Sequence, residues 1–165
     1  MSEINNPGPW IPLIIAHKAA DQAVNNSVVL VNDDHLLFTL VPNAVYLVEL
    51  YFLQQSVSVN SNFKSGWSYP AGCSIQWGIM KDPSTAGYAQ AWRGVAVTKN
   101  AARATTESES DNCAAFIGTQ ALRIIALVIN GANAGNLNFQ WAQDTAVAED
   151  TKVLENSCLI AHRLK

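Results

Sequence analysis

Cys158 and His162 are the residues of this chain whose types and spacing come nearest to a catalytic pair. A thiol and an imidazole act as nucleophile and general base when the two side chains are within hydrogen-bond reach. A separation of four residues brings two side chains together on a helix. The surrounding SCLIAHRL alternates as a strand does, so we interpret the pair as incidental.

Motifs of the common enzyme classes are absent from the sequence, including GxSxG, HExxH, GxGxxG and the phosphate-binding Gly-Lys-Ser/Thr. Asp33 and Asp34 fall in a predicted turn at residues 32–34, where Asp commonly hydrogen-bonds to the backbone. A glycosidase could draw its two carboxyl groups from distant parts of the chain. The pattern nevertheless favours a protein that is not an enzyme and uses no cofactor.

Metal binding has little support in the sequence. The cysteines are far apart and lack CxxC or Cys/His spacing: Cys73, Cys113 and Cys158. Alternating acids within residues 107–111 could bind a hard cation, but a polar, acidic stretch of this kind is more typical of a solvated loop. The sequence predicts free thiols and no metal site.

Aromatic side chains offer a different chemistry, which is stacking on a sugar ring. Trp67 and Tyr69 lie in SGWSYP, within residues predicted to form a loop or a weak strand pair, and Tyr88 and Trp92 lie in a predicted long connection. Loops that carry exposed aromatics are reasonable ligand sites. The alternative, which the sequence favours, is that these rings fill a sandwich core or a contact between subunits.

The composition limits the partners. Of 165 residues, 14% are charged and 49% hydrophobic, and the net charge is −3. The charged share is below the roughly 25% of ordinary soluble domains. Because stable interfaces lose charge at their centres, an oligomer is favoured. No polybasic block is present, which argues against nucleic-acid binding.

Membrane and secretion signals are not evident. The stretch MSEINNPGPW lacks the basic and apolar regions of a secretory signal. The longest apolar run, ALRIIALVIN, contains Arg123 and is shorter than the roughly 20 residues that span a bilayer. We expect a protein that is made in a cytoplasm and has no membrane partner.

Residues 1–19 are predicted to form an extended N-terminal arm. The prolines of MSEINNPGPWIP fix the backbone near polyproline II and prevent a helix. A large aromatic between two prolines would anchor an arm on a partner, or else fold back on its own domain. In the first case, the contact would be made by Trp10, Ile11 and Leu13.

Residues 20–165 are predicted to form one all-β domain. The stretch VVLVNDDHLLFTLVPNAVYLVELYF alternates along its strands, and its last strand is apolar on both faces. One face would meet the opposite sheet, and the other a neighbouring subunit. CSIQWGIM is predicted to form a further strand. Ile and Val predict a strand over Ala121–Ile129, which would pair with GNLNFQWAQ as a hairpin. Together these strands indicate a β-sandwich.

The C-terminal LNFQWAQDTAVAEDTKVLENSCLIAHRL resembles the last hairpin of a group of tailed-bacteriophage virion proteins. These carry G-x-L-x-[LF]-x-[WF]-A-Q, a Thr/Ser/Ala-rich turn and T-x-[VL]-x-x-x-S-x-[LI]. The matching residues are Gly135, Leu137, Phe139, Trp141, Ala142, Gln143, Thr151, Val153, Ser157 and Leu159. Upstream, the acids Asp33 and Asp34 before LLFTL and the aromatic strand VYLVELYF are also similar to the group.

The resemblance implies a jelly-roll β-sandwich, similar to TNF-like domains, that trimerises around a three-fold axis. Members are capsid decoration (cement) proteins or domains of tail fibres and other appendages. We therefore expect a structural virion protein on the capsid surface, a homotrimer that contacts the major capsid protein and clamps neighbouring capsomers. The alternative is a receptor- or glycan-binding appendage tip.

The resemblance also suggests roles within the C-terminal segment. Leu137, Phe139 and Trp141 would fill the core or the seam between subunits. Asn138 and Gln140 would point the other way, where amides can pair with the same residues of another copy without desolvating a charge.

Overall fold

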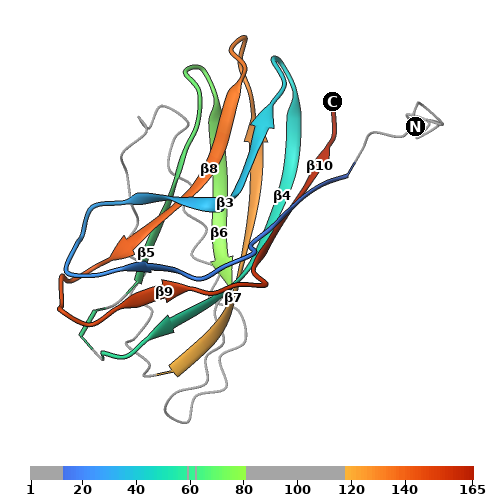
Figure 1. Ribbon diagram of the computed structural model, residues 1–165. Helices are drawn as coiled ribbons and strands as arrows, with labels where there is room; N and C mark the ends of the chain where they lie inside the picture. Colours follow the sequence, from blue (N-terminus) through green and yellow to red (C-terminus); the bar gives the residue numbers. More distant parts are fainter. Residues whose placement is uncertain (1–12, 59, 62, 81–117) are drawn as a thin grey trace.

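The fold is all-β, as the sequence predicts. Figure 1 shows the computed structural model, which describes residues 13–58, 60–61, 63–80 and 118–165. These residues contain no helix, and so none that could cross a membrane. The strands are β1 (Ile14–His17), β2 (Gln22–Val24), β3 (Val31–Leu40), β4 (Val45–Ser56), β5 (Phe63–Ser68), β6 (Ser74–Met80), β7 (Gly118–Ile129), β8 (Gly135–Gln143), β9 (Thr151–Val153) and β10 (Cys158–Arg163).

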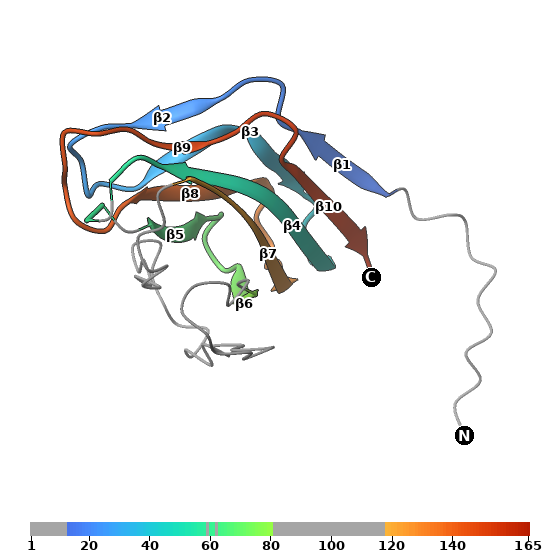
Figure 2. The same ribbon diagram turned by 90° about the horizontal axis from the view of Figure 1, so that it is seen from below.

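The strands form two antiparallel sheets that pack as a sandwich (Figure 2). The larger sheet has the order β1-β10-β4-β7-β6, and β9 joins it beside the end of β4 and pairs in turn with β2. The smaller sheet has the order β3-β8-β5. The longest ladder joins β4 and β7 along the whole of both strands. This ladder forms the centre of the larger sheet.

The core lies between the sheets and is rich in aromatic rings. On β4, Tyr46 is fully buried, and its ring meets that of Phe38 edge-on, with 5.4 Å between the centroids. Further along, Phe52 and Phe139 approach to 5.2 Å from opposite sheets. Large rings fill much volume with few rotatable bonds, so they join the two layers into one core.

Strand partners differ from the predicted hairpins. β7 and β8 follow one another in the chain but lie in different sheets. β8 and β10, the two strands of the predicted terminal hairpin, also lie in different sheets. Two predicted hairpins are therefore wrong: the one that pairs Ala121–Ile129 with GNLNFQWAQ, and the C-terminal one. Alternation shows which side chains face the core, but it does not show which strand supplies the backbone partner.

The crossing from β7 to β8 is tight. At Gly131, an added Cβ would lie 2.7 Å from the carbonyl oxygen of Gly72, so no larger residue fits without a shift of the backbone. Next to it, Asn130 donates from its amide to the carbonyl oxygens of Val41 and Asn133. The glycine-rich reversal expected here does exist, but it passes the chain to the other sheet.

The predicted arm overlaps the sandwich. Ile14–His17 form β1 and pair with β10, so this part of residues 1–19 belongs to the larger sheet. Leu13, just before it, is 48% exposed. Trp10 and Ile11 lie outside the described residues. An edge strand is held by backbone hydrogen bonds that side-chain patterns at a proline-rich end do not reveal.

Candidate functional site

The outer face of the larger sheet carries a patch of aliphatic side chains across four strands. Register places Ile160 of β10, Glu49 of β4 and Ile125 of β7 in one row across the sheet. Ile15 and Ile129 on this face are 61% and 49% exposed. Its aliphatic side chains are Ile15, Val45, Leu47, Leu53, Ile125, Leu127, Ile129 and Ile160. An apolar surface that spans several strands is typical of an interaction site.

A polar cluster lies within this apolar face, and we call it the Glu49 cluster: Glu49, Tyr51 and Arg123. Arg123 Nη2 lies 2.6 Å from Glu49 Oε2, and the Tyr51 hydroxyl donates to the same oxygen at 2.7 Å. The guanidinium also stands 5.1 Å from the centroid of the Tyr51 ring. Short charge-assisted bonds of this kind fix the orientation of all three side chains.

The electrostatics of the Glu49 cluster keep its carboxylate ionised. The hydrogen bonds from Tyr51 and Arg123, in that order, lower the pKa of Glu49 below its ordinary value. The bond to Glu49 in turn raises the pKa of Tyr51. Because Glu49 and Arg123 have opposite charges, the cluster is neutral overall. A neutral cluster can be covered by an apolar partner at lower cost than an isolated charge.

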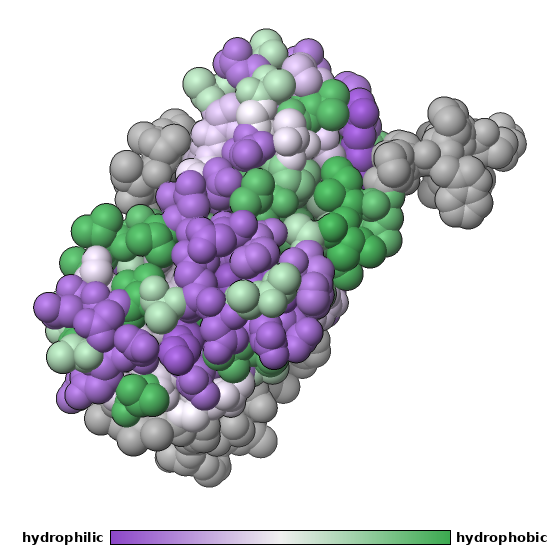
Figure 3. Space-filling view, in the orientation of Figure 1, coloured by the Kyte–Doolittle hydropathy of each residue, from purple (hydrophilic) through white to green (hydrophobic). Residues whose placement is uncertain are grey.

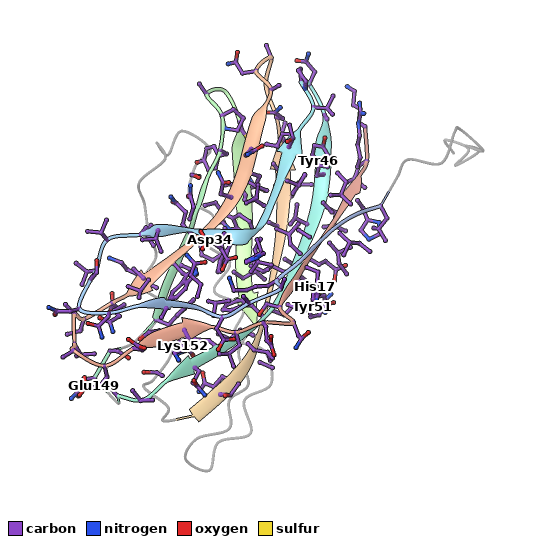
Figure 4. The ribbon with its side chains drawn as sticks, viewed as in Figure 1. His17, Asp34, Tyr46, Tyr51, Glu149 and Lys152 are labelled. Carbon is purple, nitrogen blue, oxygen red and sulfur yellow. The ribbon has the colours of Figure 1, made fainter. Side chains whose placement is uncertain are left out.

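The predicted incidental pair, Cys158 and His162, lies on β10, which is a strand as expected. Residues four apart along a strand are about 13 Å apart, too far for a proton transfer between them. Cys158 instead has His17 of β1 and Tyr51 of β4 opposite it in the register. Figure 4 labels His17 and Tyr51, which lie near one another at this end of the larger sheet.

The outer face of the smaller sheet is polar and bonded within the chain. Asn138 donates its side-chain amide to the Ser68 hydroxyl at 2.9 Å, and Gln140 donates to Asn32 Oδ1 at 2.9 Å. Both residues point outward as predicted. Their partners are on β5 and β3 of the same chain, so no second copy is needed to satisfy these donors. Hydrophilic residues dominate the middle of the surface in Figure 3.

The C-terminal motif supplies core residues. Leu137, Phe139 and Trp141 are fully buried between the sheets. The Trp141 ring stacks on Phe63 with 5.8 Å between centroids. Gln143, also fully buried, accepts from the backbone amides of Ser27 and Val147. The WAQ part of the motif therefore joins the core to the loop between β8 and β9.

Lys18 and Asp33 form a buried ion pair that no sequence pattern predicted. Lys18 Nζ lies 2.9 and 2.8 Å from the two carboxylate oxygens of Asp33, and both side chains are fully buried. Asp33 also accepts from the backbone amides of His35 and Leu36 and from the Trp141 indole. These donors satisfy the carboxylate, as burial of a charge requires.

The position of Asp33 corrects the predicted turn at residues 32–34. These residues lie inside β3, where the register with β8 shifts between Asn32 and Leu37. The shift is a bulge that turns Asp33 inward while the exposed Asp34 stays outside. Lys18 is held by backbone hydrogen bonds with Ser157 and Asn156. The pair thus joins the chain after β1, the bulge of β3 and the loop before β10.

Trp67 is not available for stacking on a sugar. It lies on β5 with 5% of its surface exposed and packs edge-on against Phe139 at 5.4 Å. Tyr69 is half-buried and packs against the same core. Tyr88 and Trp92 lie outside the described residues. The loop-binding hypothesis was wrong for Trp67 because β5 turns this residue inward.

The thiols and possible metal ligands are dispersed. Cys73 is buried, and its burial raises the pKa of the thiol to about 11. Cys158 is half-buried, and Cys113 lies outside the described residues. In the part of the chain that the structure describes, no group of three or more His, Cys, Asp or Glu side chains could hold a metal ion.

Comparisons with known protein families, with characterised proteins and with solved structures find no match. The outer face of the larger sheet combines aliphatic side chains with one oriented, neutral polar cluster. Such a surface is suited to contact with another protein surface of similar character.

Proposed function

We propose that the chain is a structural protein of a tailed-bacteriophage virion, a capsid decoration protein that forms a homotrimer and clamps neighbouring capsomers. The apolar outer face of the larger sheet is the observation that supports this most. Its aliphatic rows lie on a chain in which 14% of residues are charged. Burying that surface between copies removes it from water, which is favourable in proportion to its apolar area.

A jelly-roll topology for the sandwich is part of the proposal. Successive strands of the chain cross between the sheets, from β3 to β4 and from β7 to β8. The last strand, β10, lies between β1 and β4, and β8 lies between β3 and β5. A jelly roll is a double-sheet fold whose strands cross between the sheets, so these crossings support the proposed topology. The resemblance of the C-terminal motif to virion proteins supports the same reading.

The clamp would act through repeated weak contacts. A stable contact between two copies buries about 800 Å² on each. Once trimerised, the copies would hold several capsomers at a high effective concentration, so weak contacts with the major capsid protein add up to tight binding. Residues Trp10, Ile11 and Leu13 would extend the footprint on the shell. No catalysis and no nucleic-acid binding are part of this role.

Mass and location test the proposal. The purified protein should have about three times the 17.8 kDa mass of one chain in light scattering at micromolar concentration. In purified particles it should be present in many copies on the shell. A mass equal to one chain would refute self-association. A few copies, confined to a tail or fibre, would favour the appendage alternative. Deleting residues 1–12 should weaken shell binding and leave the trimer intact.

A further inference from the structure

We propose that the Glu49 cluster sets the register of self-association, with Arg123 of one copy bonded to Glu49 of the next. The inference rests on the proposed function, because it requires that the outer face of the larger sheet meets another copy. It adds a specific contact to that interface and assigns the residues that decide which arrangement forms.

The hydrogen-bonding capacity of the cluster is only partly used within one chain. Both bonds to the carboxylate end on Glu49 Oε2, which leaves Oε1 without a partner. The Arg123 Nε is buried without a hydrogen-bond partner, and the bond to Glu49 is made by Nη2. The side chains keep 37% and 22% exposure for Arg123 and Glu49. A neighbour could therefore reach the cluster through Glu49 Oε1 and the exposed part of the Arg123 guanidinium, but not through the buried Nε.

The aliphatic residues around the Glu49 cluster explain why it could set the register of association. Glu49 is flanked in its row by Ile160 and Ile125, and the next row holds Leu47 and Leu127. Apolar contacts are non-directional, so aliphatic rows alone would permit many alignments of two sheets at similar free energy. A buried polar group that finds its partner in one alignment only removes that degeneracy.

The charges are complementary between copies. Among the described residues of β1, β10, β4 and β7 that point to this face, Glu49 is the carboxylate and Arg123 the permanent cation, beside His17, His162 and Cys158. If Arg123 of each copy meets Glu49 of the next, every Arg123 and every Glu49 in a closed ring is paired across an interface. A cyclic assembly can satisfy this condition at every interface.

Charge exchange tests the inference. Glu49→Arg gives a copy whose cluster is positive, and Arg123→Glu gives one whose cluster is negative. Each variant alone should assemble at least about 100-fold more weakly than the wild type, because like charges meet across the interface. An equimolar mixture of the two should recover part of the affinity. Glu149→Arg, on an exposed loop away from Tyr51 (Figure 4), makes the same charge change as a control and should leave assembly unchanged.

Sedimentation equilibrium on each sample, with circular dichroism to verify the fold, separates the outcomes. A monomeric wild type would remove both the proposed function and this inference. A trimeric wild type with variants that assemble as tightly as the Glu149→Arg control would overturn the inference alone. So would a mixture that assembles no better than its components while the double exchange in one chain restores assembly, since the pairing would then act only within a copy.

Discussion

The two outer faces of the sandwich contrast sharply. On the smaller sheet, side-chain amides and hydroxyls bond across strands, as in Thr39 to Asn136 and Asn138 to Ser68. On the larger sheet, the outward positions of β10, β4 and β7 include an aliphatic patch with the Glu49 cluster inside it.

The two outer faces thus differ in how their outward side chains are satisfied. The inner side chains of both sheets belong to one buried core, so core formation does not explain the difference. Polar groups that are mutually bonded stay compatible with solvent, whereas exposed aliphatic rows favour association. The difference supports the larger sheet as the proposed interaction surface.

The largest effect is expected at the buried ion pair of Lys18 with Asp33. Lys18→Met should lower the free energy of unfolding by about 3–5 kcal/mol, because it leaves the buried Asp33 carboxylate without its cation. Lys152→Met, at a half-buried lysine on β9 without an ion pair, is the matched control and should cost far less. Urea denaturation of both variants measures the difference, and equal midpoints would contradict the role given to the pair.

A charge placed on each face tests the contrast directly. Leu127→Arg on the larger sheet should weaken self-association by about 3 kcal/mol, roughly 100-fold or more in dissociation constant. Gln140→Arg on the smaller sheet should leave it unchanged. Both positions are half-buried, so the pair is matched for exposure. Light scattering over a dilution series gives the result, and an equal loss in both variants would erase the distinction between the faces.

A smaller effect is expected from the amide bonds of the smaller sheet. Asn138→Ala removes the donor to Ser68 and should lower the free energy of unfolding by about 1 kcal/mol, with no change in oligomeric mass. Thermal unfolding and light scattering on the same sample measure the two quantities. Dissociation of the oligomer would show that this face also takes part in association.

The smallest effect is expected in the dependence of stability on acid pH. Because folding lowers the pKa of Glu49, its interactions stabilise the folded state fully above the ordinary value of 4.5 and lose that contribution as the pH falls through the folded-state value. Wild type should therefore exceed Glu49→Gln in stability at pH 7, and the difference should vanish in strong acid. Denaturation at a series of pH values tests this, and a constant difference would exclude ionisation as the cause.

Alternation was enough to predict much of the secondary structure. The strands at β4, β6, β7 and β8 fall where hydrophobic periodicity places them, and the inward set Leu137, Phe139 and Trp141 is the buried set. The prediction that β4 carries apolar residues on both faces is also confirmed, since Leu47 faces outward beside Leu127. These features depend only on neighbours within one strand, which is why a linear reading captures them.

The burial of Lys18 is a feature that alternation along the sequence did not predict. In the sequence this lysine stands in a short polar stretch, AHKAADQ, which is typical of an exposed segment. Its burial depends on Asp33, fifteen positions later, and on a bulge in β3 that no local pattern indicated. The same reason explains the Glu49 cluster, because Arg123 lies 74 residues from Glu49 and reaches it only through the pairing of β4 with β7.

By itself, then, the order of residues determined that the chain forms strands, which side of each strand is apolar, and that few charges are left for the surface. Only the folded arrangement decided which strands pair, which outward face is aliphatic, and which charges meet. The physical reason is that side-chain alternation is a property of one strand, whereas pairing and polar contacts require the loops to bring distant segments to within hydrogen-bond distance.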